Sequence, residues 1–491
     1  MNQDPAREIR ASVGDRARIS FVSGNFNVVH AGHLRLLTFA KENSDFLVVA
    51  VNPDFTPGVA VPQALRVDGV RAIGIVDFAL PLTEPLPDLI CRLQPDIVVK
   101  GREFQDQVNV EAAAVESYGG ELLFSGGEMR FTAIGMLDRE YKRSATATID
   151  KPIEYPMRHH FDFGDLRRVI NDICGMRVLV LGDLIVDRYI DCEPLGMSQE
   201  DPTIVVTPLE EKVFVGGAGI VAAHARGLGG DVQFITVAGK DESCAFARDA
   251  LVEYDIDANI LIDETRPTTS KQRFRASGKT LLRVNRLRQH GIQPDLIADV
   301  LEAVEARLAH TDLILFSDFN YGFLPQSLVD AVTERALERG IMLAADSQAS
   351  SQIADVSRFK RTTLLTPTER EARLALNNRD SGLVSVAEAL RRKAEAENVI
   401  ITIGSEGLLV QAPLDDSFQT DQLAAFNSSP RDVAGAGDAL FTAASMALRT
   451  GANIWLSAYL GSLAAGCQVA RLGNTPLAAE DILHELDDHV G

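Results

Sequence analysis

Two segments of the chain combine glycines with residues that act on phosphate groups. The first, residues 24–33, contains two histidines three positions apart, His30 and His33. It follows a strand-like run at residues 19–22 and leads into an apolar helical pattern, so both imidazoles can face one phosphate group from a helix start. The segment therefore predicts a nucleotide site, the alternative being a pair of structural histidines.

The second segment, residues 432–438, reads Asp-Val-Ala-Gly-Ala-Gly-Asp and runs directly into a helical stretch at residues 439–448. Its glycine amides would point at an anion from a helix N-terminus. Asp438 would stand beside a phosphate group that approaches the backbone, where a carboxylate can take a proton during an in-line transfer. The alternative is a glycine-rich turn with an aspartate cap. Two nucleotide sites in one chain predict two consecutive reactions.

Composition limits the class of protein and its partners. With 491 residues the chain is long enough for two or three domains. Its net charge of -21 would repel nucleic acid and an anionic membrane, so we expect neither as a partner. The five cysteines form no CxxC pair, which favours a reducing cytosol, and no apolar run reaches the length of a membrane span. These features predict a cytoplasmic protein whose nucleotide sites are locally basic or assisted by magnesium.

The distribution of strand-like and helical patterns predicts an α/β fold with two doubly wound domains. A first domain, residues 1–138, contains short buried strands spaced as in a parallel sheet. A polar, proline-interrupted stretch at residues 139–170 is predicted to be a linker. The second domain, residues 171–491, begins with the strand at residues 177–183. Residues 189–213 and 271–288 are polar and β-branched and are predicted to form a small β lid over its site.

The first segment resembles the GxFDxxHxGH signature of nucleotidyltransferases that join a nucleoside monophosphate to a sugar phosphate or alcohol phosphate. The resemblance extends through residues 48–54 and 95–101, in the order seen in the adenylyltransferase half of ADP-heptose synthases, and implies a Rossmann-like nucleotidyltransferase domain. In that chemistry the acceptor phosphate attacks the α-phosphorus in line, and the histidines neutralise the leaving pyrophosphate. Asn27 stands where the family has Asp, and residues 55–63 lack the expected basic side chains. The resemblance implies His30 and His33 as catalytic residues and Gly24, Asn25, Phe26, Asn27, Gly32, Arg66 and Lys100 as nucleotide-binding residues.

The second domain is similar to ribokinase-like (PfkB) sugar kinases, on residues 216–219, 366–371, 401–407 and 432–438. By that similarity Asp438 is the base, and Glu371 orients Mg²⁺ through water, with K⁺ as a further cation near the anion hole and ATP as a substrate. The implied anion hole is Gly435, Ala436 and Gly437, and the implied nucleotide-binding residues are Thr402, Gly404 and Gly407. The implied sugar-binding residues are Asp183, Asp187, Gly216, Gly217, Lys271, Arg273 and Asp432.

Within the kinases, residues 181–189 and 198–202 are most similar to the heptose-phosphate kinase half of the ADP-heptose synthases. Several acceptor-side positions differ from that pattern: Ile220 replaces Asn, Tyr321 and Gln348 replace lysines, and Thr368 replaces the Asn of an NxxE motif. Lys271, Arg273, Arg275 and Arg283 could restore the missing positive charge from the lid. A solvated strand face is the alternative explanation for those four residues.

Together the two halves predict a bifunctional ADP-heptose synthase-like protein with its domains in reversed order. The second domain would phosphorylate a sugar or sugar phosphate at the anomeric hydroxyl, and the first would activate a sugar 1-phosphate with a nucleotide. We expect small-molecule partners, a homodimer, and a phosphatase acting in trans between the two steps. One alternative keeps both reactions but uses another sugar or an alditol, with ATP or CTP. In the other, the first domain is a non-catalytic nucleotide-binding or regulatory module on an active kinase.

Overall fold

The structure is a computed structural model that describes residues 5–13, 17–27, 29, 31–56, 59, 61–101, 109–125, 149–198, 201, 203–276, 279–348, 355–414, 417–427 and 430–487. His30, one of the two predicted catalytic histidines, lies outside the described residues, as do residues 139–148 of the predicted linker. Within these ranges no helix is both long enough and apolar enough to cross a membrane.

The first domain is a parallel sheet with helices on both faces, as predicted. Across the described residues its five strands have the order β3-β2-β1-β4-β5. The chain reverses its winding direction between β1 and β4, and ligands of such sheets bind outside the carboxyl ends of the strands at that point. The strands are β1 (Ile19–Gly24), β2 (Phe46–Val51), β3 (Phe78–Pro81), β4 (Ile97–Gly101) and β5 (Glu121–Ser125). The helices are α1 (Pro5–Ser12), α2 (Ala31–Glu42), α3 (Gln63–Arg71), α4 (Leu86–Leu93) and α5 (Ala112–Glu116).

The second domain is built on a nine-stranded sheet in the described part of the chain, with the order β10-β9-β6-β13-β14-β15-β16-β17-β18. Pairing is parallel from β10 to β16, and antiparallel between β16, β17 and β18. Its strands are β6 (Arg177–Gly182), β9 (Asp231–Ala238), β10 (Asp257–Ile262), β13 (Leu313–Asp318), β14 (Met342–Ser347), β15 (Leu364–Leu365), β16 (Asn398–Thr402), β17 (Leu408–Leu414) and β18 (Ser417–Leu423).

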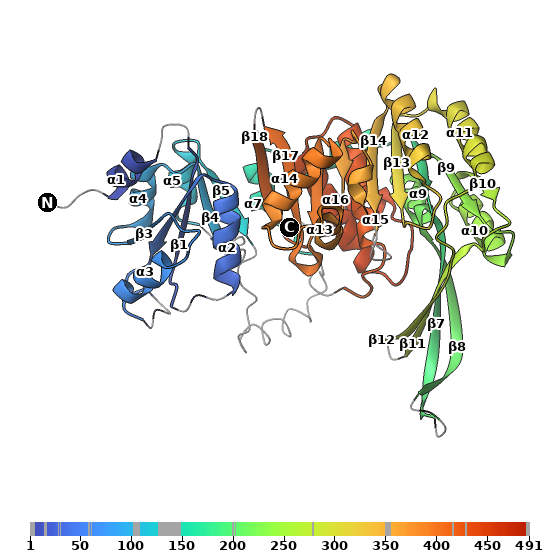
Figure 1. Ribbon diagram of the computed structural model, residues 1–491, viewed down its shortest axis with the longest axis horizontal. Helices are drawn as coiled ribbons and strands as arrows, with labels where there is room; N and C mark the ends of the chain where they lie inside the picture. Colours follow the sequence, from blue (N-terminus) through green and yellow to red (C-terminus); the bar gives the residue numbers. More distant parts are fainter. Residues whose placement is uncertain are drawn as a thin grey trace.

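Helices cover this sheet on both faces (Figure 1). They are α7 (Glu154–Arg158), α8 (Phe163–Asp172), α9 (Ala218–Gly227), α10 (Glu242–Glu253), α11 (Pro294–Leu308), α12 (Gln326–Glu338), α13 (Glu369–Leu376), α14 (Leu383–Ala394), α15 (Ala436–Arg449), α16 (Ile454–Val469) and α17 (Ala479–Asp487), with 3-10 turns η2 (Val356–Arg358) and η3 (Gly404–Glu406). The two predicted doubly wound α/β domains are therefore confirmed.

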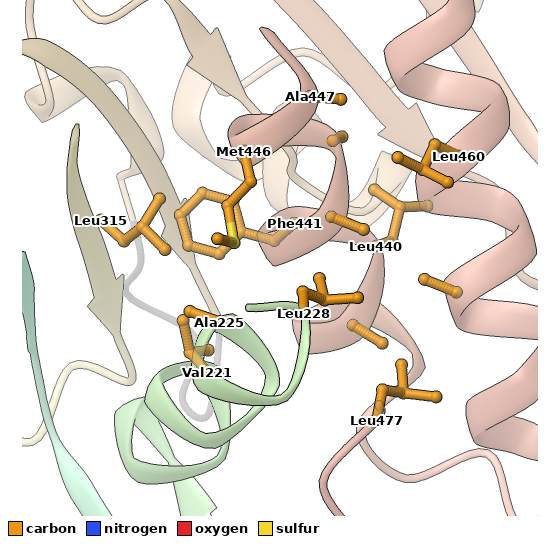
Figure 2. Packing of buried hydrophobic residues seen from close by; sticks show 14 of the residues in the cluster. Val221, Ala225, Leu228, Leu315, Leu440, Phe441, Met446, Ala447, Leu460 and Leu477 are labelled. Carbon is orange, nitrogen blue, oxygen red and sulfur yellow. The ribbon is translucent and has the colours of Figure 1, made fainter. Parts of the chain in front are cut away.

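The core of the second domain holds α15 rigidly. Residues 438–447 of this helix are all buried, because α15 packs against α9, α16 and the sheet at once. Figure 2 shows Phe441 and Met446 of α15 beside Leu315 of β13, with Leu440 turned toward Leu460 of α16. Burial on every side fixes the helix, so its first turn, where Asp438 lies, is a fixed platform.

A separate four-stranded sheet forms an arm that projects from the body of the second domain (Figure 1). In the described residues it has the order β12-β11-β7-β8. Its strands are β7 (Leu184–Met197), β8 (Ile204–Gly217), β11 (Thr269–Ala276) and β12 (Lys279–Arg286). β7 and β8 pair antiparallel, and β11 joins β7 in parallel. The predicted small sheet is therefore confirmed, and its role as a lid over the site stays a prediction.

The segment predicted as a linker differs from that expectation over its described part, residues 149–170. Ile149 pairs with Asn427 of the second domain, and Tyr155 and Leu166 are fully buried in that domain's core. The buried carboxylate of Asp421 accepts hydrogen bonds from Arg158 at 2.9 Å and lies 2.8 Å from His159 Nε2. Polar residues and prolines suggested a linker, but the apolar residues between them are sufficient to attach α7 and α8 to the core.

The two domains share a packed interface. α2 of the first domain contacts α14 of the second, β5 contacts β18, and one apolar cluster extends across both. Gln419 Nε2 donates to Glu121 Oε1 at 3.2 Å, and the Arg158 guanidinium lies 5.0 Å from the centre of the Phe124 ring. The carboxylate of Glu42, at the end of α2, accepts hydrogen bonds from backbone amides at the start of α14, including that of Val384. Burial raises the pKa of Glu42, and these hydrogen bonds oppose the shift.

Candidate active sites

The first candidate site lies at the carboxyl end of β1. Gly24 ends the strand, and Asn25 Oδ1 accepts a hydrogen bond from Asn52 Nδ2 at 2.8 Å. Phe26 has a φ of 48°, a left-handed conformation that is unusual for an aromatic residue, and its buried ring lies 4.9 Å from the ring of His33. The loop therefore brings His33, on the first turn of α2, beside the predicted nucleotide-binding residues.

Other predicted members of this site are held by protein groups. Asn27 Oδ1 accepts from the Val61 amide at 3.4 Å, and Gly32 lies in the first turn of α2. Arg66 is buried, and it donates to the Asn25 carbonyl at 2.7 Å and to Asp54 at 2.8 Å.

Lys100, at the end of β4, lies 2.9 Å from Glu111 in a largely buried ion pair. Like Arg66, it therefore has a carboxylate partner. Arg66 and Lys100 therefore hold the loops of the site in place, and the positive charge of each is at least partly neutralised by its carboxylate partner.

The second candidate site is centred on Asp438, in the first turn of α15. Gly435 caps this helix with a φ of 77°, and the space beside Gly437 is open. A phosphate group can therefore approach closely enough for the N–H groups of residues 435–437 to donate hydrogen bonds to it. Asp438 is 5% exposed, and its Oδ1 lies 3.5 Å from Gln348 Nε2. Burial raises the pKa of Asp438 to about 7, while the charge of Lys271 opposes the shift. A carboxylate with this pKa is suited to general base catalysis near neutral pH.

The sugar-binding residues predicted on β7 and β8 lie close together. Asp187 Oδ2 accepts from Asn474 Nδ2 at 3.0 Å, and Arg273 lies 3.9 Å from Asp187 Oδ1. A Cβ on Gly216 would lie 2.3 Å from Asp187 Oδ2, so only glycine allows this approach. Gly217 has a φ of 61° and is likewise in close contact with the backbone. Burial raises the pKa of Asp187, and the charges of Lys271 and Arg273 oppose this shift.

Two predicted sugar-binding carboxylates hold loops of the protein itself. Asp183 accepts hydrogen bonds from the amides of Phe319, Tyr321 and Phe323 at 2.9, 3.2 and 3.3 Å. Asp432 accepts from the Tyr189 hydroxyl at 2.9 Å and from two backbone amides. Burial and the charge of Asp318 raise the pKa of Asp183, against the effect of its three amide partners. Both side chains therefore position neighbouring loops, and contact with a sugar stays a prediction for each.

The lid contributes positive charge to the second site. The Lys271 ammonium lies 5.0 Å from the centre of the Phe319 ring and 5.4 Å from that of Tyr321, where the kinase pattern has a lysine. Arg283 on β12 pairs in register with Arg273 on β11. Their charges, with that of Lys271, oppose the rise in the pKa of Asp187 that burial causes, so these side chains act on the site in addition to forming a strand face.

Glu371 lies beside a buried carboxylate, Asp346, that the sequence analysis did not identify. Glu371 accepts from the Thr368 amide at 2.8 Å in a capping box at the start of α13, and Asp346 accepts from Thr366 Oγ1 at 3.1 Å. Burial, and then the charges of Glu371 and Asp438, raise the pKa of Asp346 well above its usual value. A divalent cation would relieve this repulsion, so the residues fit Mg²⁺, which is held by one or two carboxylates with water and substrate phosphates. No group of three or more candidate protein ligands gathers among the described residues.

A cleft of about 1020 Å³ opens between α13 and the turn η3, and Thr368, Thr402 and Gly404 are among its lining residues. Thr402 and Gly404 are therefore placed together as predicted. Gly407 has a φ of 101°, and a Cβ there would lie 2.0 Å from the Leu423 carbonyl, so it allows the turn. The cleft is also lined by three arginines, Arg370, Arg373 and Arg379. They were not identified as site residues from the sequence, because only the fold brings α13 beside η3.

The comparisons with known proteins agree with this geometry. Residues 176–480 match the family model described as pfkB family carbohydrate kinase. The chain belongs to the pfkB family. Residues 21–124, outside the pfkB region, match the cytidylyltransferase-like model.

Two curated relatives of this pfkB chain share a name that describes them as bifunctional. The Bifunctional protein HldE of Caulobacter vibrioides is 30% identical over 322 residues, which cover 63% of each chain. That of Desulfatibacillum aliphaticivorans is 28% identical over 316 residues, covering 64% of this chain and 63% of the relative. The chain therefore matches over about 63% of the length of these relatives.

Solved structures show the same fold for the pfkB part. Phosphofructokinase-2 from Escherichia coli, in complex with substrates and products, aligns with a TM-score of 0.53 at 15% identity, covering 64% of this chain and 99% of that one. That enzyme has also been solved in complex with potassium. Ribokinase from Giardia lamblia aligns with a TM-score of 0.52 at 17% identity and the same coverage.

Proposed function

We propose that the second domain transfers the γ-phosphoryl group of ATP to a hydroxyl of a sugar or sugar phosphate. The observation that carries this proposal is the buried carboxylate of Asp438, in the first turn of α15 beside Gly435–Gly437, with its pKa raised to about 7. Asp438 takes the proton of the acceptor hydroxyl while the hydroxyl oxygen attacks the γ-phosphorus. The bond from that phosphorus to the bridging oxygen breaks, and ADP leaves.

The remaining residues position and neutralise the reactants. The amides of residues 435–437 stabilise charge on the phosphoryl group, and Lys271 and Arg273 lie beside Asp187, where the acceptor binds. The arginine-lined cleft between α13 and η3 accepts the anionic nucleotide. Glu371 and Asp346 would hold Mg²⁺, which would neutralise charge on the phosphate oxygens.

For the first domain we propose nucleotidyl transfer to a sugar 1-phosphate. An oxygen of the sugar phosphate attacks the α-phosphorus of a nucleoside triphosphate, and the bond to the departing pyrophosphate breaks. His33 would stabilise charge on the triphosphate from the start of α2. The resemblance of both halves to ADP-heptose synthases supports heptose 7-phosphate and heptose 1-phosphate as the respective acceptors, and the printed name of the two relatives supports two activities in one chain. The reversed domain order, the homodimer and the phosphatase acting in trans stay predictions.

A second candidate function is favoured by one feature of the first site. Lys100 is paired with Glu111, and Arg66 with Asp54, so both predicted phosphate-binding cations already have carboxylate partners. Asn27 also replaces the aspartate of the nucleotidyltransferase pattern. A first domain that binds a nucleotide without turning it over, and regulates the kinase, is consistent with these contacts.

A coupled screen of the purified chain separates the candidates. ADP release is measured with a panel of sugars and with heptose 7-phosphate, and pyrophosphate release is measured with sugar 1-phosphates plus ATP or CTP. Turnover with both heptose phosphates supports the bifunctional proposal. ADP release without pyrophosphate supports the binding module, and absence of ADP release with every acceptor contradicts the kinase proposal. Asp438→Asn is the matched control for ADP release, and His33→Ala for pyrophosphate release.

A further inference from the structure

A buried amide side chain lies directly beneath the anion hole. Gln468, on α16, is fully buried, and its Nε2 donates to the carbonyl of Gly473 at 2.9 Å and to that of Ala434 at 3.4 Å. Both carbonyl oxygens can only accept hydrogen bonds, so the NH₂ group, and not the amide oxygen, must face them. The other end of the amide, Oε1, has no hydrogen-bond partner among the described residues.

Gln468 and Asp432 together hold the loop that contains Ala434 and the loop that contains Gly473, an arrangement that we call the clamp. Asp432 accepts hydrogen bonds from the backbone N–H groups of Ala434 and Gly473, each at 3.1 Å. Gln468 donates to the carbonyls of the same two residues. A Cβ on Gly435 would lie 3.3 Å from Gln468 Nε2, so the amide also packs against the first residue of the anion hole. The clamp therefore fixes the backbone from which the anion hole begins.

The predicted K⁺ does not fit this arrangement. Monovalent cations are bound by oxygen atoms such as backbone carbonyls. Beneath the anion hole lie the carbonyls of Ala434 and Gly473 and the carboxylate of Asp432, and Asn474 Oδ1 lies beside Gly435. Gln468 Nε2 already lies within hydrogen-bonding distance of both carbonyls. An ion that joined the two carbonyls would have to take the place of this nitrogen.

We propose that Gln468 is a positioning residue that replaces a monovalent cation beneath the anion hole, so that phosphoryl transfer by this chain is independent of K⁺. The inference rests on the proposed kinase function, but the clamp itself is a property of the folded protein. Because the amide is neutral, it holds the loops without adding charge. Charge on the transferring phosphoryl group is then met by the amides of residues 435–437 and by lid cations such as Lys271.

The test compares the full chain in KCl and in tetramethylammonium chloride at equal ionic strength. The first readout is the melting temperature without nucleotide, which does not depend on turnover. The second is ADP release with the acceptor found in the coupled screen. For the wild type we expect the same melting temperature in both salts and less than about a twofold difference in turnover. A saturable, K⁺-specific rise of roughly 5 °C, the size expected when a bound ion stabilises a large domain, would overturn the proposal whether or not the chain is a kinase.

Two variants separate the clamp from simple packing. Gln468→Ser removes the amide and leaves room beside the two carbonyls, so we expect reduced turnover that KCl partly restores, together with a K⁺-specific rise in melting temperature. Gln468→Met fills nearly the same volume without a donor, and we expect reduced turnover that no salt restores. Full wild-type turnover in both variants would show that Gln468 does not position the anion hole. If Gln468→Ser does not fold, the wild type and Gln468→Met still decide the outcome.

Discussion

The raised pKa of Asp438 predicts that the second site opposes the stability of its own fold. The pKa of this carboxyl is about 7 in the folded chain, against an ordinary value of 3.8. In the unfolded chain the group ionises above pH 3.8, but in the folded chain it stays protonated until about pH 7. The folded state therefore loses stability as pH rises between these two values, and the loss is complete above pH 7.

The difference of about three pKa units corresponds to about 4 kcal/mol at pH 8, and to only about 1.5 kcal/mol at pH 5. Asp438→Asn removes the ionisation and keeps the shape of the side chain. We expect this variant to gain stability over the wild type as pH rises, by about 2.5 kcal/mol between pH 5 and pH 8. The cost of burying the new amide is the same at every pH, so it does not change this slope.

The assay is urea unfolding of the nucleotide-free wild type and variant at pH 5, 6, 7 and 8, with ADP release measured in parallel. Asp438→Asn should lower ADP release by about 10²-fold or more, because a general base contributes at least that much. Asp68→Asn, which alters an exposed carboxylate on α3, is the matched control and should show no such slope. A stability difference between Asp438→Asn and the wild type that does not change with pH would refute the reasoning, since Asp438 would then ionise as it does in water.

Three further predictions concern the first site, the interface and the sugar site. His33→Ala should lower pyrophosphate release by about 10²-fold and leave ADP release near the wild-type rate, because only the first site loses a charge-stabilising group; loss of both activities would contradict independent sites. Glu42→Ala should destabilise the chain by about 1 kcal/mol in urea unfolding, because the amides at the start of α14 lose their cap, and an unchanged midpoint would argue against that contact. Gly216→Ala should lower ADP release at least about tenfold, because its Cβ would lie 2.3 Å from Asp187 Oδ2. The control variant Gly69→Ala, which has open space around the new Cβ, should keep the wild-type rate. Equal rates for the two variants would show that Asp187 does not bind the acceptor.

Local patterns in the sequence were sufficient to predict the two sheets and the positions of both glycine-rich loops. Alternating apolar runs and helix starts are local signals, and the strands predicted at residues 19–22 and 177–183 correspond to observed β1 and β6. Residues 149–170 were assigned to a linker because of their polar residues and prolines, although Tyr155 is fully buried and Leu166, Val169 and Ile170 of α8 recur at helical spacing. Prolines and polar residues in one part of a segment do not prevent the rest from packing against the core.

The remaining site residues could not be found in the sequence because they act through distant contacts. Gln468 lies within a uniformly apolar helix, α16, and only the fold brings it beneath residues 434–437. Asp346 lies within the buried strand β14, and its role depends on its nearness to Glu371. Arg66 and Lys100 were placed at the correct loops, but their carboxylate partners are apparent only from the three-dimensional contacts.

The apolar cluster that extends from α2 into α14 has a consequence for how the chain unfolds. Because α2 is buried on one side by its own sheet and on the other by the second domain, separation of the domains would expose an apolar surface to water. Part of the free energy of unfolding of each domain therefore comes from its contact with the other domain. Calorimetry should record one cooperative transition for the two, and a substitution that weakens either core should lower the temperature at which both chemistries are lost.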